Sequence, residues 1–337
     1  EGDVMPAYYG ETANSCKLED CLRKAADMIG WEKKPLRQVM PDGKIRARGV
    51  AMAMQGSSIS NCDVGSVTVK LSDEGTYHIT VGCTDMGTGC DTIIAQFAAD
   101  VLETPIDNIS VYGVDTDISP YDSGSYASST TYLTGMAAVK ACEQLRERII
   151  ALAAVRMNKD ASALTFDGEN VIDESDGAKM SLFDIATASM CNNEISLEVT
   201  YSHSSPVSPP PFMAACAEIE ADPETGAIEL LDYTACVDCG TVVNTNLARV
   251  QTEGGLLQGI GMTLYEDVWY NEKGVNLSNS LMQYKIPTRM DMGNLHVEFE
   301  SSYEPTGPFG AKSIGEIVIN TPAPALTHAI ANATGLW

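Results

Sequence analysis

Apolar residues recur every three or four positions in several stretches of this chain, a spacing that buries one face of an α-helix. In the first stretch, Leu18, Cys21 and Ile29 share such a face. The pattern predicts helices around residues 18–29, 93–102, 138–152, 182–188, 244–262 and 324–333. Gly335 follows the last of them, where a helix commonly ends in a left-handed residue.

Other stretches alternate apolar and polar residues, which is typical of half-buried strands. They predict strands over 48–54, 66–71, 76–81, 109–114, 195–201, 212–221 and 227–237, with further strands after 262. Turn residues at 73–75, 167–168 and 222–226 join neighbouring strands into hairpins. Hairpins with helices interspersed among them predict an α+β fold. A proline-rich connector at 205–211 divides the chain.

A glycine-punctuated loop, Gly82-Cys83-Thr84-Asp85-Met86-Gly87-Thr88-Gly89-Cys90-Asp91, joins a predicted strand to a predicted helix. A loop of this kind at a helix N-terminus exposes backbone N–H groups that hold a phosphate without cations. The alternative is an ordinary tight turn with Thr88 as the helix cap. The loop is therefore a candidate anion site, and on its own a weak one.

Hydroxyl residues gather in a second run, Asp122-Ser123-Gly124-Ser125-Tyr126-Ala127-Ser128-Ser129-Thr130-Thr131, before the long helix. Such a run is first of all a helix cap, but it also offers donors to a polar ligand. Two donor surfaces, each at a helix N-terminus, favour one extended anionic ligand that both share.

The helix predicted over 244–262 contains Gly254, Gly255, Gly259 and Gly261. Each glycine costs about 1 kcal/mol relative to alanine, so their number indicates close approach by another backbone or a ligand. Gln258 lies among them with an amide that both donates and accepts hydrogen bonds, unless it is simply solvated.

The stretch Gly310-Ala311-Lys312-Ser313-Ile314-Gly315-Glu316 follows the turn-rich run 305–308 and precedes the last helix. Glycines around one carboxylate let the backbone approach a ligand while Glu316 is aimed at it. A carboxylate enclosed by apolar groups is a good general base at neutral pH. The plainer interpretation is a surface loop with a solvated glutamate.

Composition narrows the class of protein. The 337 residues carry 21 Lys and Arg against 46 Asp and Glu, a net charge of −25. This balance argues against nucleic acid or anionic lipid as a partner. No apolar run of membrane-spanning length and no signal peptide is present, and scattered cysteines predict reduced thiols, so we expect a cytoplasmic protein.

Cys236 and Cys239 form a C-x-x-C without further ligands at suitable spacing, so buried thiols are expected rather than a metal site.

Taken together, these segments resemble the molybdenum hydroxylases, the xanthine dehydrogenase/aldehyde oxidoreductase family. The resemblance covers nearly the whole chain and rests on five segments in order: 82–89, 127–130, 238–244, 251–259 and 310–316. It corresponds to the C-terminal half of the family's molybdopterin-binding chain. Within the family, the chain is similar to the medium molybdopterin subunit of bacterial nicotinate dehydrogenases, in which that chain is split.

The resemblance implies a fold of two subdomains of mixed or antiparallel sheets with flanking helices. Residues 1–44 would complete a domain together with a partner chain. Residues 45–200 would form the first molybdopterin-binding subdomain, and residues 201–337 the second, which carries the catalytic glutamate.

The resemblance also assigns roles to individual residues. Glu316 matches the catalytic base, and Gln258 matches a glutamine beside the metal's ligands. The cofactor-binding positions are Met86, Gly87, Thr88, Gly89, Asp91, Ala127, Ser128, Ser129, Thr130 and Gln258. Met54, Gln55 and Gly56 fall where the family places a substrate-facing aromatic residue, which this chain lacks. Thr88 replaces a common glutamine, which removes one side-chain contact but no backbone contact.

The implied cofactor is molybdopterin cytosine dinucleotide, with molybdenum held through the pterin and a sulfido or selenido ligand on the metal. No ferredoxin-type cysteine run or flavin fingerprint occurs in the sequence. The [2Fe-2S] and FAD groups are therefore expected in partner subunits, beside a large molybdopterin subunit. Electrons would pass through them to NAD(P)+.

The expected activity is hydroxylation of an electron-poor ring carbon with oxygen from water, as in nicotinate to 6-hydroxynicotinate. A purine, xanthine or aldehyde hydroxylase of the same family is the first alternative. A scaffold subunit without catalysis is the second, and the retention of Glu316 speaks against it. A simple anion-binding module is the third, and it leaves Glu316 and the glycine-rich helix unexplained.

Overall fold

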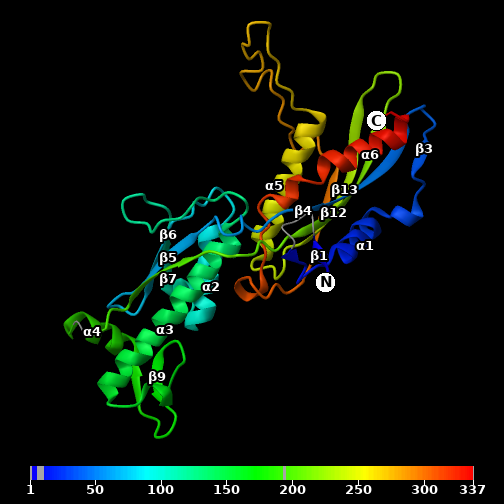
Figure 1. Ribbon diagram of the computed structural model, residues 1–337. Coiled ribbons are helices and arrows are strands. Elements are labelled where there is room, and N and C mark those ends of the chain that lie inside the picture. Colours follow the sequence, from blue (N-terminus) through cyan, green and yellow to red (C-terminus); the bar gives the residue numbers. More distant parts are fainter. Residues whose placement is uncertain (1, 6–10, 193–194, 337) are drawn as a thin grey trace. The chain divides into compact units, whose positions relative to one another are not determined.

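The computed structural model describes residues 2–5, 11–192 and 195–336, which form two compact units. Unit 1 comprises residues 1–56, 209–305 and 314–337, and unit 2 comprises residues 57–208 and 306–313. Figure 1 traces the chain through both units. Unit 2 is thus inserted between parts of unit 1, because strands from both ends of the chain pair in one sheet.

Unit 1 is built on a five-stranded sheet in the order β14-β13-β12-β4-β3. Its strands are β3 (Arg37–Val39), β4 (Ile45–Met54), β12 (Phe212–Ala221), β13 (Ile228–Asp238) and β14 (Asn294–Glu300). All neighbours are antiparallel except β13 and β14, which are parallel. The predicted hairpin of residues 212–237 is confirmed, and its second strand joins a parallel neighbour that the pattern did not predict.

Helices cover both faces of this sheet. Helix α1 (Leu18–Ile29) buries Cys21, Ala25 and Ile29 against Ala214, Cys216 and Cys236. On the other face, α5 (Thr245–Leu264) and α6 (Pro322–Thr334) pack with alternate residues of the same strands, including Met213, Ala215 and Val237. The strand β12 is therefore buried almost throughout, because its side chains of both orientations meet a helix.

Close packing of α6 depends on Gly49 in β4. A Cβ atom at this position would collide with backbone atoms of Ala325 and Ala329. The absent side chain lets the helix lie directly on the strand, as the red helix and blue strand in Figure 1 illustrate. Helix α6 ends at Gly335 with φ of 77°, which confirms the predicted C-terminal cap.

Unit 2 contains a four-stranded sheet in the order β11-β5-β6-β7. Its strands are β5 (Gly65–Leu71), β6 (Tyr77–Val81), β7 (Ile109–Tyr112) and β11 (Glu198–His203). Helices α2 (Cys90–Leu102) and α3 (Gly135–Met157) pack on one face, where Val67, Val69 and Ile79 are fully buried. The other face carries residues such as Lys70 and His78, which are exposed.

Smaller elements complete the two units. Unit 1 also has β1 (Val4–Met5) paired with β2 (Glu11–Thr12), and single turns η1 (Trp31–Lys33) and η6 (Ile317–Ile319). The remaining elements belong to unit 2: η2 (Ile106–Asn108), η3 (Thr130–Thr134), η4 (Ala161–Ala163), β8 (Leu164–Phe166), β9 (Asn170–Asp173), β10 (Lys179–Ser181), α4 (Leu182–Asn192) and η5 (Pro308–Gly310). Strands β8, β9 and β10 form a separate three-stranded sheet.

The mixed architecture confirms the predicted α+β fold with two sheet-and-helix units. The proline-rich connector lies at a unit boundary, since unit 2 ends its first span at Ser208. The units divide the chain differently from the expected ranges 1–44, 45–200 and 201–337. Described residues before position 45 belong to unit 1, because β3 pairs with β4 and α1 packs on β12. That residues 1–44 also contact a partner chain stays a prediction, and residues 1 and 6–10 lie outside the described part.

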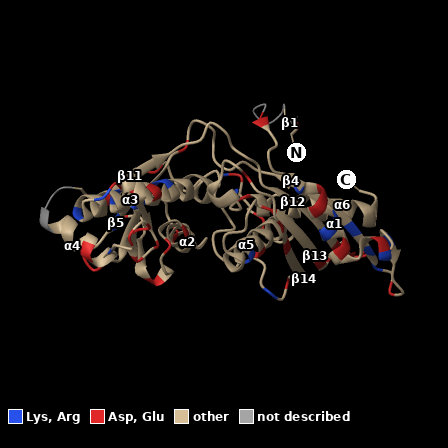
Figure 2. Cartoon of the chain, turned by 90° about the horizontal axis from the view of Figure 1, so that it is seen from below, with Lys and Arg blue, Asp and Glu red and all other residues tan. Residues whose placement is uncertain are grey.

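Charged residues of both signs mix along the surface, as Figure 2 shows for α1. On that helix Arg23 pairs with Glu19, and Lys17 pairs with Asp20 at 3.1 Å. All nine cysteines with described side chains are free thiols. Cys236 and Cys239 are buried, as expected, and a hydrogen bond to Cys236 together with burial raises the pKa of Cys21.

Candidate functional site

The glycine-rich loop before α2 gathers two backbone donors on one oxygen. The N–H groups of Gly87 and Gly89 donate to Oδ1 of Asp85 over 2.9 and 3.1 Å. Both glycines have positive φ, 99° and 77°, which turns successive N–H groups inward. The loop therefore already binds one anionic oxygen, that of its own Asp85, in the way expected for a phosphate. Sequence reasoning missed Asp85, whose position two residues before a glycine is the signal of such a turn.

Around this loop the candidate residues differ in exposure. Met86 is exposed, Thr88 is half-buried, and Cys90 is buried at the first position of α2. Burial, and next the charge of Asp85, raises the pKa of Asp91. Ligand atoms of Asp85, Cys90 and Asp91 lie within 4.8 Å of one another. The thiol of Cys90 donates to Asp91 over 3.7 Å, so this cluster is internally bonded beside the anion-binding loop.

The hydroxyl run forms a second turn in unit 2. Ala127 and Ser128 have φ of 50° and 56°, a left-handed conformation that exposes consecutive peptide groups. Ser129 is buried and its hydroxyl donates to the carbonyl of Gly124, while Thr130 begins a π-helical turn. The N-cap residues of the π-helical turn and of α3, Ser129 and Thr134, make no side-chain capping hydrogen bond, so the predicted capping role is not confirmed at these two positions. The turn is held by its backbone, including a bond from Ser58 N to Ala127 O of 2.9 Å.

The turn at 308–310 is also part of unit 2. Phe309 stacks on Phe97 of α2 with ring centroids 5.9 Å apart. Ser57 Oγ accepts a bond from the N–H of Ser313 over 3.0 Å, and the side chain of Lys312 is buried. The first half of the Gly310–Glu316 stretch is thus fixed by packing, in contrast to an ordinary surface loop.

Unit 1 holds Glu316 and the glycine-rich helix. Helix α5 confirms the predicted close approach, because a Cβ at Gly255 would meet Val318 and one at Gly259 would meet Pro322. The amide of Gln251 donates to the carbonyl of Gly315 over 2.8 Å. These contacts fix the backbone on both sides of Glu316, whose own side chain is exposed.

The remaining candidates lie in the same unit. Gln258 is exposed on α5, and Met54 is exposed at the end of β4. The side-chain oxygen of Gln55 accepts a hydrogen bond from Asn320 over 3.2 Å, which ties the end of β4 to the turn that follows Glu316. Unit 1 therefore brings together Gln55, Glu316 and α5, whereas the two donor turns belong to unit 2.

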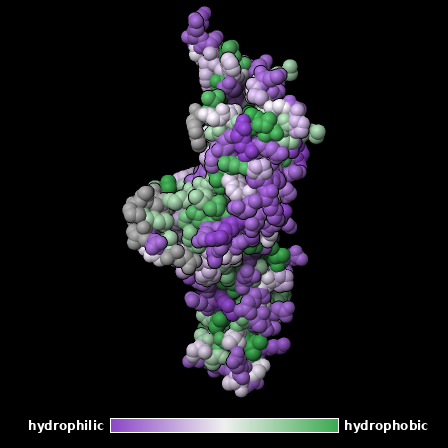
Figure 3. Space-filling view, turned by 90° about the vertical axis from the view of Figure 1, so that its right-hand side faces the viewer, coloured by the Kyte–Doolittle hydropathy of each residue, from purple (hydrophilic) through white to green (hydrophobic). Residues whose placement is uncertain are grey.

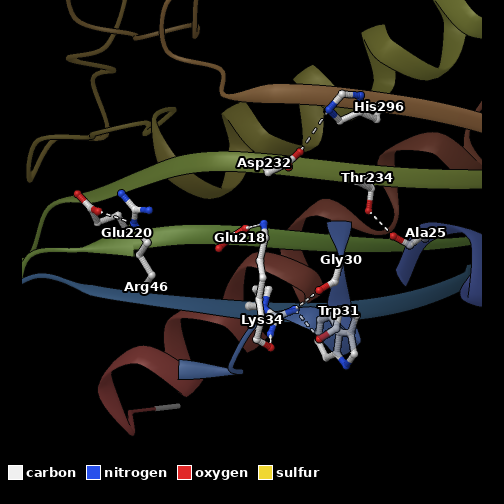
Figure 4. A network of polar contacts seen from close by, with 11 residues as sticks. Ala25, Gly30, Trp31, Lys34, Arg46, Glu218, Glu220, Asp232, Thr234 and His296 are labelled. Atoms are coloured by element: carbon white, nitrogen blue, oxygen red, sulfur yellow. Dashed lines mark hydrogen bonds and ion pairs between the residues drawn. The ribbon is translucent and has the colours of Figure 1, made fainter. Parts of the chain in front are cut away.

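A cavity of about 390 Å³ lies on the α1 face of the sheet in unit 1, and none of the predicted site residues lines it. Figure 4 shows the polar network there, in which Lys34 pairs with Glu218 at 2.5 Å. Arg48 is buried, donates to the carbonyls of Gly30, Trp31 and Lys34, and lies over the Trp31 ring. These contacts hold the segment after α1 against the sheet. We therefore interpret the polar network as a stabilising feature of the fold.

Residues 24–293 match the molybdopterin cofactor-binding domain family. The chain is 36% identical over 332 residues to a probable hypoxanthine oxidase of Escherichia coli strain K12, covering 97% of this chain and 34% of that protein. It is 31% identical over 339 residues to the gamma subunit of the 6-hydroxypseudooxynicotine dehydrogenase complex of Paenarthrobacter nicotinovorans, covering 98% and 42%.

Among solved structures, quinoline 2-oxidoreductase from Pseudomonas putida 86 superposes with a TM-score of 0.88 at 24% identity, covering 98% of this chain and 45% of that one. The chain thus spans a third to less than half of the length of the proteins it matches. In the part of the chain that the structure describes, no helix is long and apolar enough to cross a membrane. The length of the family match and the identity to these relatives show that this chain belongs to the molybdenum hydroxylase family and carries its molybdopterin cofactor-binding domain.

Proposed function

We propose that this chain is the molybdopterin-binding subunit of a cytoplasmic hydroxylase acting on an electron-poor N-heterocycle, with nicotinate as the first substrate to test. The observation that carries the proposal is the fixed position of Glu316. Gln251 holds the preceding carbonyl, and the buried side chains of Ile317 and Val318 anchor the following turn. A carboxylate held this way on a rigid backbone suits a proton acceptor.

The two donor turns of unit 2 fit an anionic, dinucleotide-containing cofactor. The N–H groups of Gly87 and Gly89 already converge on one carboxylate oxygen, so a phosphate oxygen fits there once Asp85 turns away. Met86, Thr88 and Asp91, with the turn at 127–130, would line the same ligand. We propose molybdopterin cytosine dinucleotide, with a sulfido or selenido ligand on molybdenum; when bound, its metal supplies the oxygen-transfer and two-electron redox chemistry.

The roles of this chain's own residues follow from their chemistry. Glu316 would accept a proton from the group that delivers oxygen to the substrate. Gln258 would orient that group through its amide, which donates and accepts. Met54, Gln55 and Gly56 would border the substrate, with Gln55 held by Asn320.

A complete enzyme requires further subunits under this proposal. A large molybdopterin subunit would supply the substrate-orienting residues, and [2Fe-2S] and FAD subunits would carry electrons to NAD(P)+. A specific observation favours a purine as the second candidate substrate, because one relative at 36% identity is named as a probable hypoxanthine oxidase.

The test is to co-express this chain with its partner subunits and to measure molybdenum, released CMP and turnover of nicotinate and hypoxanthine. We expect Glu316→Gln to lower kcat about 10³-fold while molybdenum content stays at the wild-type value. Glu174→Gln, at an exposed position in unit 2, serves as the matched control and should leave kcat unchanged. Turnover of hypoxanthine but not of nicotinate would make a purine the proposed substrate. Full activity of Glu316→Gln would refute the catalytic role of Glu316.

A further inference from the structure

A row of polar side chains crosses four strands of the unit 1 sheet at the cavity on its α1 face. In the register of the sheet, Arg48 of β4 pairs with Glu218 of β12, Glu218 with Asp232 of β13, and Asp232 with Asn294 of β14. Paired residues of neighbouring strands point to the same face, so the four side chains lie side by side on one surface. All four line the cavity, and Figure 4 shows Glu218 and Asp232 on their adjacent strands.

A β-bulge lies at this row. Glu218 pairs with Asp232, but the next residue of β12, Ile219, pairs with Leu230, so Leu231 is the extra residue on β13. Leu231 also lines the cavity. Bulges re-aim side chains and occur more often than average beside binding sites.

Most of the charged side chains at the cavity are paired within the chain. Lys34 pairs with Glu218 at 2.5 Å, and Arg46 pairs with Glu220 at 2.8 Å. Lys44, which also pairs with Glu220, is not among the lining residues. These contacts leave one cation and one anion among the side chains that line the cavity.

The remaining cation is Arg48, which is 2% exposed. Its two terminal nitrogens donate to the carbonyls of Gly30, Trp31 and Lys34, so the guanidinium group is held in place. Its Nε is buried and has no hydrogen-bond partner among the residues that the structure describes. A buried N–H group of this kind calls for an acceptor, and a negatively charged acceptor forms the stronger bond.

The remaining anion is Asp232. Its Oδ1 is buried and accepts no hydrogen bond from the described part of the chain. Nε2 of His296 lies 3.7 Å from this oxygen, which exceeds hydrogen-bond distance. Burial raises the pKa of the Asp232 carboxyl group, whereas the charges of His296 and Lys34 lower it. A hydrogen-bond donor, above all a cationic one, would stabilise the carboxylate.

A ligand that satisfies both atoms carries an anionic acceptor at one end and a cationic donor at the other. A simple anion or a simple cation would satisfy only one of them. The cavity volume of about 390 Å³ is near the lower end of the range for small-molecule sites, which suits a small metabolite. Gln38 and Asn294, both exposed, add amide groups to the lining. In Figure 3, which faces the side of Figure 1 where β3 is labelled, hydrophilic residues predominate over hydrophobic ones.

We propose that this cavity is a binding site for a small zwitterion of the α-amino acid class. The carboxylate of the ligand accepts from Nε of Arg48, and its ammonium group donates to Oδ1 of Asp232. Helix α5 and the turn that follows Glu316 pack on the opposite face of the sheet, so this site is separate from the one at Glu316. The ligand is therefore not the substrate of the proposed hydroxylation, and the inference stands independently of the proposed function.

The experiment titrates L-glutamine into the full chain, in its purified assembly, and measures binding by isothermal titration calorimetry. Two further probes each differ from L-glutamine by one charged group: glutaramate lacks the ammonium group, and 4-aminobutanamide lacks the carboxylate. Each of them should bind at least about 10-fold more weakly than L-glutamine, because one hydrogen bond between charged groups is lost.

The variant Asp232→Asn keeps the size of the side chain and removes its charge. Its affinity for L-glutamine should fall at least about 10-fold. Its affinity for glutaramate should not fall, since this probe has no ammonium group, and that retained binding shows that the variant is folded. Glu298→Gln, at an exposed position on the same face of β14, is the matched control and should bind L-glutamine as the wild type does.

Equal affinities for the three probes would overturn the proposal. So would the absence of binding heat and of any rise in Tm with L-glutamine at millimolar concentration, because ordered water alone would then satisfy the two atoms. Unchanged binding of L-glutamine by Asp232→Asn, or tighter binding of glutaramate than of L-glutamine, would likewise rule out a zwitterion site. Glu316→Gln should bind L-glutamine as the wild type does, so the result does not depend on hydroxylase activity.

Discussion

The two main sheets of this protein are covered differently. In unit 1 helices pack on both faces, so consecutive residues of β12 such as Cys216 and Ala217, which point to opposite faces, are both fully buried. In unit 2 helices pack on one face, so Val69 is buried while its neighbour Lys70 is exposed. In unit 1 the segments around Glu316 and Gln55 are held by hydrogen bonds from Gln251 and Asn320. In unit 2 Met86 and Gly87 of the loop before α2 are exposed. Rigidity and openness are thus assigned to different units of one chain.

The largest expected effect is at Gly49, where α6 meets the doubly covered sheet. Gly49→Ala should destabilise unit 1 by about 3 kcal/mol or more, because the new Cβ collides with backbone that has no room to move. Denaturant unfolding followed by hydrogen exchange in β4 would measure the loss. Thr68→Ala, on the less covered face of β5, is the control and should cost about 1 kcal/mol or less, the contribution of its cross-strand hydrogen bond with Thr200. Equal effects of the two substitutions would contradict the difference between the sheets.

Next in size is the effect of removing Arg48 from the α1 face. Arg48→Ala should cost about 2–4 kcal/mol, because the carbonyls of Gly30, Trp31 and Lys34 lose their donor and the Trp31 ring loses its cover. The exposed Lys70→Ala on the other sheet should be nearly neutral. Thermal unfolding of both variants is the measurement. A small effect of Arg48→Ala would mean that water replaces the guanidinium and that the α1 face is more open than the structure indicates.

Two smaller effects on stability, of opposite sign, are expected within α5. Gly255→Ala should destabilise by about 1–2 kcal/mol, since Val318 has to move, whereas Gly254 has open space around it. Gly254→Ala should therefore stabilise the protein by about 0.5–1 kcal/mol through better helix propensity. Urea midpoints of the two variants test the opposite signs. If both stabilise, the helix has room to shift and the backbone that follows Glu316 is less rigid than proposed.

The smallest effect is a pH dependence in unit 2. Burial, and then the charge of Lys140, lowers the pKa of His203 below its ordinary value near 6.5. The unfolded chain consequently binds this proton more readily, so this contribution to stability is complete above about pH 6.5 and is lost as pH falls through the lowered pKa. In the His203→Gln variant, the urea midpoint of unit 2 should depend less on pH between about pH 7 and 5. An identical pH profile in the variant would assign the dependence to other groups.

Much of the fold follows from local patterns. Residues 18–29 have the three-and-four spacing of a helix, and 66–81 alternate around a turn, and both form as predicted. The parallel pairing of β13 with β14 was not predicted, because residues 294–300 acquire a parallel partner only through tertiary contacts. The further strands expected after residue 262 reduce to β14 and one isolated bridge between Tyr270 and Asn276.

The backbone geometry of the candidate site follows in part from residue type. Gly87 and Gly89 indicated a tight loop, because glycine adopts positive φ without the steric cost of a side chain. The role of Asp85 escaped notice, since a carboxylate inside a loop expected to bind an anion opposes the expected charge. Likewise Ser129 looked like a free donor, yet its hydroxyl is bonded to Gly124. Residue type predicts which groups can bind a ligand, but local hydrogen bonding decides which of them are used within the chain.

The insertion of unit 2 within unit 1 has a consequence for synthesis on the ribosome. Strand β4 ends at Met54, but its partner β12 begins at Phe212, about 160 positions later. At roughly 5–20 residues per second, the edge of β4 that pairs with β12 stays unmatched for about 10–30 s, during which the first span of unit 2 is synthesised. A waiting strand of this kind is open to wrong pairing. The nascent chain should therefore need a chaperone most between the emergence of β4 and that of β12, and slowing translation in that window should lower the yield of folded protein.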